Sequence, residues 1–233
     1  AGEAPVYVVH LSSAAGLAEV RKARAAGQRH FGVETCTQYL TLTEAAYSDP
    51  QEGLKAIMSP PLRTGADCAA LWGGLADGSI DAVATDHCPF RFAVEKQYGV
   101  GDFTACPNGA PGVEERLPVL YSEGVAKGRI SLPQLVRLAC TEPSRLYGLY
   151  PQKGAIQPGA DADVVILDPN GTRTLTQSTL HSAADYTCYE GMELQGKIDL
   201  VLSHGEVIVQ DNQFLGRKGA GRYLKRGRSC LAE

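Results

Sequence analysis

The sequence predicts an α/β protein with a parallel sheet or barrel in its larger part and a smaller β-rich module after Pro151. As far as Pro151, apolar β-branched segments alternate with helical patterns at the spacing of successive β-α units. Beyond this proline the pattern changes to short strands joined by turns. We therefore expect two structural parts, with the boundary between residues 151 and 152.

The first β-α unit begins with an apolar run at residues 5–10, which is typical of a strand buried on both faces of a parallel sheet. Ser12 and Ser13 follow as candidate N-caps of a helix. Apolar residues then recur at helical spacing until Gly27, which ends the predicted helix.

Two more strands are predicted at residues 31–35 and 80–85, and a helix at 66–76 leads into the second of them through Asp77-Gly78. A segment rich in Gly, Pro and polar residues follows at 86–112, and a loop of that length inside a compact domain is usually functional. Further helical patterns cover residues 113–127, 132–139 and 143–149.

The β-rich module has two clear strand patterns, residues 162–168 and residues 197–209, and the second contains the turn signal His204-Gly205. Its last residues form a basic tail. Residues 211–233 carry a net charge of about +4 within a chain of formal charge -4, so the rest of the chain is acidic. This distribution argues against a broad nucleic-acid interface.

Composition also limits the class of protein. The chain has 233 residues, enough for one domain with a sizeable core plus a smaller one, and it contains no apolar run of membrane-spanning length. Its seven cysteines are scattered and include no C-x-x-C motif, which favours reduced thiols and a cytoplasmic location. The N-terminal residues 1–5 have no signal-peptide pattern, and the missing initiator Met suggests a start in mid-fold.

Two side chains stand where a barrel enzyme places its catalytic groups. His10 ends the first predicted strand and Asp86 follows the third. Parallel strands present their carboxyl ends at one face, where a histidine and a carboxylate can share a metal ion. Taken alone, a histidine after an apolar strand is more often structural than functional.

Several collinear motifs strengthen the functional interpretation. In order and spacing they resemble the hydantoinase/dihydropyrimidinase family of cyclic amidohydrolases, over essentially the whole chain. The motifs are VHLS at 9–12, ETCTQYL at 34–40, MSPPLR at 58–63, TDHCPF at 85–90, PNGAPGVEER at 107–116, residues 154–168 and DYTCYEGM at 185–192.

The resemblance implies the C-terminal part of a distorted (β/α)8 TIM-like amidohydrolase barrel, with strands six to eight in residues 1–151. Residues 152–233 would add strands of a small β-sandwich. It implies that His10 is a metal ligand and that Asp86 is both a metal ligand and the catalytic acid-base. Ser59 and Asn108 match positions that contact the cyclic amide, largely through main-chain groups.

The chemistry that the resemblance implies is ring opening of dihydropyrimidines such as dihydrouracil, or of 5-substituted hydantoins, to N-carbamoyl amino acids. Two divalent ions, usually zinc, lower the pKa of the attacking water and polarise the amide carbonyl. Asp86 would take a proton from that water and deliver it to the departing ring nitrogen. The complete proteins of the family are expected to be homotetramers, with the basic tail packed on a neighbouring subunit.

The chain lacks parts of the family's site. It contains no H-x-H pair after a first strand, no matching metal-bridging carboxylated lysine and no strand-five histidine. We therefore expect the isolated chain to bind metal weakly and to be inactive, with a missing N-terminal half needed for function. Thr37 stands where many relatives have proline, and a modest effect on the loop is expected.

Three other interpretations are weighed against this one. A non-catalytic scaffold of the collapsin response mediator type shares the fold but lacks the metal ligands, and the retained Asp86 argues against it. Allantoinases and dihydroorotases also end strand eight with an aspartate, although the sequence after Asp86 is closer to hydantoinases. A nucleic-acid module built on residues 222–228 would need a basic cluster longer than this glycine-interrupted one.

Neighbouring polar residues receive more modest predictions. His87 is expected either to support Asp86 or to be simply packed or exposed, and Cys88 to be a packing residue of the loop. Glu114-Glu115-Arg116 is expected to be structural, at a helix N-terminus. No chemistry is assigned to His30, His181 and His204.

Overall fold

The computed structural model describes residues 4–232, so residues 1–3 of the predicted N-terminal start and Glu233 of the basic tail lie outside it. A parallel sheet has the order β1-β2-β3, formed by Val6–Val8, Phe31–Cys36 and Ala82–Ala84. Strands β1 and β3 are shorter than predicted, because only these residues pair in register with the central β2. The parallel α/β prediction is confirmed.

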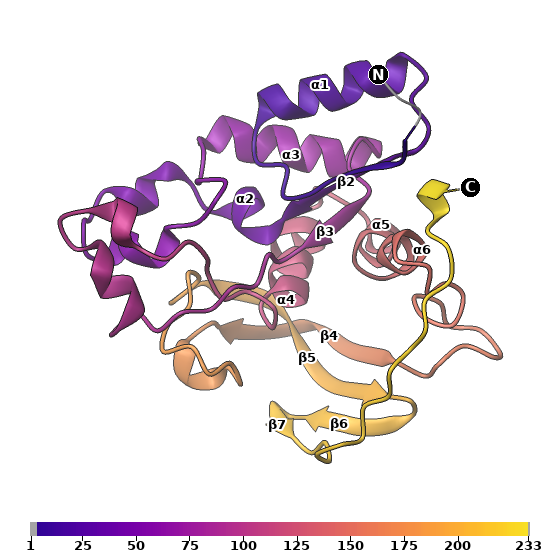
Figure 1. Ribbon diagram of the computed structural model, residues 1–233. Coiled ribbons are helices and arrows are strands. Elements are labelled where there is room, and N and C mark those ends of the chain that lie inside the picture. Colours follow the sequence, from indigo (N-terminus) through magenta and orange to yellow (C-terminus); the bar gives the residue numbers. More distant parts are fainter. Residues whose placement is uncertain (1–3, 233) are drawn as a thin grey trace.

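Two long helices cover one side of this sheet and lie side by side (Figure 1). Helix α1 spans Ala14–Ala25, and its N-cap Ser13 accepts a hydrogen bond from the Gly16 amide. Helix α3 spans Gly65–Asp77 and opens with a capping box between Thr64 and Asp67. Both helices contribute buried leucines to the core against the strands.

Short elements fill the two long connections. Between β2 and α3 lie α2 (Thr37–Thr41) and the 3-10 turns η1 (Glu44–Tyr47) and η2 (Glu52–Ala56). The predicted functional loop after β3 contains the 3-10 turns η3 (Glu95–Gly99) and η4 (Phe103–Ala105). Both connections start at the carboxyl ends of parallel strands, so they begin at the same edge of the sheet.

The later helices differ from prediction. Helix α4 (Arg116–Leu120) continues into the π-helical turn η5 (Tyr121–Ala126). The two helices predicted at 132–139 and 143–149 form one continuous segment, α5 (Leu132–Val136), the π-helical η6 (Arg137–Thr141) and α6 (Glu142–Leu146). The wider π turn just before Pro143 lets the helix continue past a residue that has no N–H to donate. Within residues 4–232, no helix is both long and apolar enough to cross a bilayer.

The β-rich module is a four-stranded antiparallel sheet in the order β4-β5-β6-β7. Strand β4 ends later and β5 begins earlier than predicted, because the two strands keep pairing across two register shifts. The bounds are β4 Val164–Thr174, β5 Glu193–Ser203, β6 Glu206–Gln210 and β7 Gln213–Phe214, with the 3-10 turns η7 Gln177–Thr179 and η8 Cys230–Ala232. The boundary between residues 151 and 152 stays a prediction.

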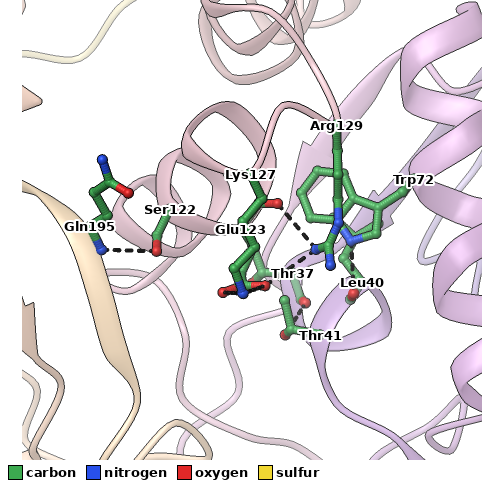
Figure 2. A network of polar contacts seen from close by, with 9 residues as sticks. All are labelled: Thr37, Leu40, Thr41, Trp72, Ser122, Glu123, Lys127, Arg129 and Gln195. Atoms are coloured by element: carbon green, nitrogen blue, oxygen red, sulfur yellow. Dashed lines mark hydrogen bonds and ion pairs between the residues drawn. The ribbon is translucent and has the colours of Figure 1, made fainter.

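The η5 turn joins this sheet to the part of the chain that contains the parallel sheet, which is called the barrel part below. The Ser122 hydroxyl accepts the Gln195 amide of β5 at 3.0 Å. On the other side of η5, Figure 2 shows Glu123 between Lys127 and Arg129, with the Arg129 guanidinium 5.2 Å from the Trp72 ring centroid. Glu123 is buried, and its ion pairs with the two cations offset part of the cost of removing its carboxylate from water.

The basic tail returns to the barrel part (Figure 1). The Gly227 amide donates to the Gly148 carbonyl at 2.7 Å, and the Leu231 carbonyl lies 3.0 Å from the His30 imidazole. These contacts place the end of the tail against its own chain, at the amino end of β2. Tyr223 is 92% exposed, and the contact of this tail with a neighbouring subunit stays a prediction.

Candidate active site

His10 and Asp86 lie at the same edge of the parallel sheet. His10 follows β1 and Asp86 follows β3, and both strands run parallel to β2, which lies between them. His10 is half-buried and Asp86 is exposed. The fold thus brings together, at the carboxyl ends of the strands, two residues that are far apart in sequence.

Both residues have an unusual backbone conformation. The φ angle is +40° at His10 and +49° at Asp86, in the left-handed region that non-glycine residues rarely occupy. Such a residue costs on the order of 1–3 kcal/mol and persists only where its surroundings fix it. Strained residues of this kind cluster at functional sites. Among the described residues, His204, Asp211 and Asn212 also have positive φ, but they lie in the turns of the antiparallel sheet, so His10 and Asp86 are the two that lie at the ends of parallel strands.

Two side chains of the central strand region fix the backbone beside these positions. The buried Thr35 hydroxyl donates to the Leu11 carbonyl at 2.7 Å, directly after His10. The Gln38 amide donates to the Thr85 carbonyl at 3.0 Å, directly before Asp86. Sequence reasoning assigned neither residue this role, because a side chain that bonds a distant carbonyl has no local sequence signature.

The sheet edge beneath the site contains a neutral thiol and a partly buried cation. Burial raises the pKa of the Cys36 thiol, and the negative charges of Glu34 and Asp86 raise it further, so Cys36 stays a neutral thiol. The Arg116 guanidinium donates to the Val83 carbonyl at 2.9 Å, and burial lowers its pKa. A cationic group therefore lies below the strand end that carries Asp86.

Ser59 and Asn108 line one cleft of about 800 Å³. Both are exposed, and they come from different connections, Ser59 from the segment after η2 and Asn108 from the segment after η4. Neither His10 nor Asp86 lines this cleft. The remaining lining residues are Tyr47, Asp49, Pro50, Gly53, Leu54, Ile57, Met58, Pro61, Gly99, Gly101, Asp102, Phe103 and Thr104.

Main-chain contacts connect the cleft to the loop of Asp86. The Gly109 amide, next to Asn108, donates to the Ile57 carbonyl at 3.0 Å. The Cys88 amide, two residues beyond Asp86, donates to the Ala110 carbonyl at 3.1 Å. Gly109 has φ +143°, and a Cβ there would lie 2.5 Å from the Cys88 carbonyl oxygen. Only glycine permits this approach of the two segments.

Two tyrosine hydroxyls form hydrogen bonds with the main chain of the segment that follows Ser59. Tyr39, in α2, donates to the Pro60 carbonyl at 2.9 Å, and Tyr47, in η1, accepts the Leu62 amide at the same distance. Burial raises the pKa of Tyr39, so its hydroxyl remains a donor across the physiological range. The sequence analysis assigned neither tyrosine this role, because their main-chain partners are not recognisable from a local pattern.

The residues with modest predictions are placed as follows. His87 is exposed, and its Nδ1 accepts the amides of Gly112 and Val113 at 3.1 and 3.3 Å. His87 therefore connects the Asp86 loop to the segment that precedes α4. Glu115 is buried and accepts the Thr187 hydroxyl, in line with a structural role. Cys88 is exposed.

The donor types of His10 and Asp86 fit a divalent metal ion such as zinc, which binds imidazole nitrogen and carboxylate oxygen. Two donors are fewer than the three protein ligands of a typical catalytic zinc site. Within residues 4–232, no group of three or more His, Cys, Asp and Glu side chains is arranged to hold a metal. The donor types of His10 and Asp86 thus fit a divalent metal ion in kind, but they are too few for a complete site.

A parallel α/β sheet with the candidate residues at the carboxyl ends of its strands, followed by an antiparallel sheet, defines the class as part of an α/β barrel with an added β-sheet module. Comparison with known families identifies it further. The model of the amidohydrolase family matches residues 8–208, and the chain belongs to this family.

Known relatives agree with the family. A D-phenylhydantoinase of Escherichia coli is 51% identical over 97% of this chain and 49% of its own length. The crystal structure of a dihydropyrimidinase from Brevibacillus agri superposes with a TM-score of 0.95 at 44% identity, over 97% of this chain and 49% of that one. An L-hydantoinase (dihydropyrimidinase) from Arthrobacter aurescens gives 0.88 at 33% identity, over 96% and 49%.

These comparisons confirm the predicted resemblance to hydantoinases and dihydropyrimidinases. They also confirm the predicted fold class, part of a TIM-like amidohydrolase barrel plus strands of a small β-sandwich. The chain spans about half the length of the relatives it matches.

Proposed function

We propose that this chain forms part of a cyclic amidohydrolase of the hydantoinase/dihydropyrimidinase type. The reaction is hydrolytic ring opening of a dihydropyrimidine such as dihydrouracil, or of a 5-substituted hydantoin, to an N-carbamoyl amino acid. The observation that carries the proposal is the position of His10 and Asp86 at one sheet edge, both in a left-handed backbone. The names of the relatives support the substrate class.

In this proposal, His10 and Asp86 are ligands of the metal centre and Asp86 is also the acid-base group. When bound, two zinc ions would lower the pKa of water and polarise the substrate carbonyl. The Asp86 carboxylate accepts the proton of the attacking water and then delivers it to the ring nitrogen as the C–N bond breaks. The exposure of Asp86 supports this role, because an acid-base group has to be accessible to water and substrate.

Ser59 and Asn108 form the substrate platform in this proposal. Their main-chain donors and acceptors hold the imide-like edge of the ring, so that the carbonyl stays in line for attack. The common cleft of the two residues supports the assignment. The connection of Gly109 to Ile57 keeps the two platform segments at a fixed spacing.

The remaining ligands, including a carboxylated lysine, would come from an N-terminal half of the kind present in the relatives. We further propose a homotetrameric assembly, a cytoplasmic location and a small-molecule substrate rather than a nucleic acid. Isolated from such a half, the 233-residue chain is expected to be inactive.

Two other functions are less well supported. A non-catalytic scaffold does not need a strained aspartate at a metal position, which argues against a collapsin response mediator type of role. Allantoinase or dihydroorotase activity would use the same aspartate. The names of the relatives favour hydantoin and dihydropyrimidine substrates over theirs.

Asp86→Asn tests the proposal, because it keeps the size of the side chain and removes the acid-base group. The variant belongs in an active protein that contains residues 1–233, either the full-length source protein or a fusion to the N-terminal half of the E. coli relative. The rate of ring opening of dihydrouracil and hydantoin, measured as the loss of absorbance, should fall about a thousandfold in this variant. His30→Ala is the control and should keep the parental rate. A near-parental rate in Asp86→Asn would overturn the assignment.

A further inference from the structure

A lysine without a carboxylate partner is buried between the two segments of the substrate platform. Lys96, in η3, is 0% exposed. Its ammonium donates to the Ile57 carbonyl and to the Pro107 carbonyl, each at 2.8 Å. Ile57 lies two residues before Ser59, and Pro107 directly precedes Asn108.

The surroundings of Lys96 are otherwise uncharged. Its Nζ lies 5.7 Å from the Phe90 ring centroid, a contact in the range of a cation–π interaction. Among the residues described, its ammonium donates hydrogen bonds to the two carbonyls and forms no ion pair with a carboxylate. Burial lowers the pKa of Lys96, and the thiols of Cys106, Cys188 and Cys88 are the titratable groups that act on it.

No opposite charge stabilises the cation at this place. A buried ammonium of this kind costs free energy, and its hydrogen bonds to the two carbonyls offset part of that cost. What the ammonium adds is geometry. Its donors are directed at two carbonyls from different connections, and the Ile57 carbonyl accepts the Gly109 amide as well.

We propose that Lys96 is a positioning residue of the substrate platform, which cross-links the Ser59 segment to the Asn108 segment. The inference rests on the proposed function for its kinetic consequence, but the cross-link itself is a property of the fold. Removing the ammonium should leave the Pro107 carbonyl with a weak thiol donor from Cys106, at 3.8 Å, and let the two segments separate.

Lys96→Met is the direct test, because methionine has a similar length and no donor. Lys55→Met is the matched control. Lys55 is a partly buried lysine of the adjacent η2, and its ammonium pairs with Glu52 and lies over the Phe92 ring, away from the platform carbonyls.

The first measurement uses the 233-residue chain and requires no activity. In Lys96→Met, hydrogen exchange of the Gly109 amide should accelerate, and the amide resonances of Ser59 and Asn108 should shift. In Lys55→Met they should not. Unchanged exchange and unchanged resonances in a folded Lys96→Met chain would overturn the cross-link.

The second measurement uses an active protein that contains this chain. Lys96→Met should lower kcat/KM for dihydrouracil and hydantoin by about tenfold or more, mainly through KM, at unchanged metal content. Parental KM in Lys96→Met would overturn the role in substrate positioning. If the unsubstituted protein opens neither ring, the proposed function fails, while the exchange measurement still decides the cross-link.

Discussion

At the residue scale, Arg91 and Glu95 close the turn that carries Lys96. The Arg91 amide and guanidinium both bond the Glu95 carboxylate, with an ion-pair distance of 2.8 Å. The Arg91 contact lowers the pKa of Glu95 from 4.5 to about 2, so this carboxylate stays ionised in the folded chain at pH values where it would be protonated in the unfolded chain.

This shift predicts an acid-sensitive contribution to stability. Because the folded pKa lies below the ordinary value, the contribution is fully present above about pH 4.5 and is lost as the pH falls toward 2. Glu95→Gln should therefore lower the unfolding midpoint in urea at pH 6, and the difference from the parent chain should shrink steadily below pH 4.5.

Arg91→Gln provides the control, because it removes the cause of the shift. In that background Glu95→Gln should change stability much less at pH 6. A difference between the parent chain and Glu95→Gln that stayed constant from pH 6 to pH 2.5 would contradict the assignment of the low pKa to this contact.

The candidate ligands His10 and Asp86 and the platform residues Ser59 and Asn108 could be proposed from motifs, since strand ends and family motifs are visible in sequence. Lys96 could not, because a lysine in a polar loop is ordinarily expected at the surface. Its burial depends on Ile57 and Pro107, which meet only in the folded chain. Thr35 and Gln38 could not be proposed for the same reason, because their main-chain carbonyl partners are distant in sequence.

At the element scale, η5 and β5 pack unusually closely where the barrel part meets the antiparallel sheet. Gly196 of β5 has φ +89°, and a Cβ at this position would lie 2.4 Å from the Tyr121 ring. Together with the bond from Gln195 to Ser122, this contact fixes the sheet against the helical segment.

Gly196→Ala should therefore destabilise the chain through both backbone strain and overlap with Tyr121, by about 2–4 kcal/mol in total. Gly191→Ala is a matched control, because Gly191 has φ +78° and open space around its Cβ position. Urea unfolding should give a clearly larger loss for Gly196→Ala. An equal loss of unfolding free energy in the two variants would contradict close packing of Gly196 against Tyr121.

The order of elements could be predicted from the sequence, because strand and helix periods and caps are local signals. The bounds of β1 and β3 could not, since strand ends depend on pairing with β2. Nor could the continuous helix through Pro143, because a proline ordinarily ends a helix and the π turn that avoids this is not encoded in a periodic pattern.

At the scale of the whole molecule, the two ends of the parallel sheet carry different features. The carboxyl end carries the candidate residues His10 and Asp86, whereas the amino end of β2 contacts the basic tail through His30 and Leu231. The basic tail and the candidate site lie at opposite ends of the strands.

The central claim is that His10 and Asp86 are ligands of one divalent metal centre. A double-mutant cycle on the 233-residue chain tests it, with zinc and cobalt affinity measured by calorimetry for His10→Ala, Asp86→Asn and the double variant, and with His30→Ala as control. Binding should be weak, because two protein ligands are few. Each single substitution should lower the affinity about tenfold or more, and the double variant should lose little beyond either one. Strictly additive losses, or affinities that none of these substitutions changes, would contradict the claim.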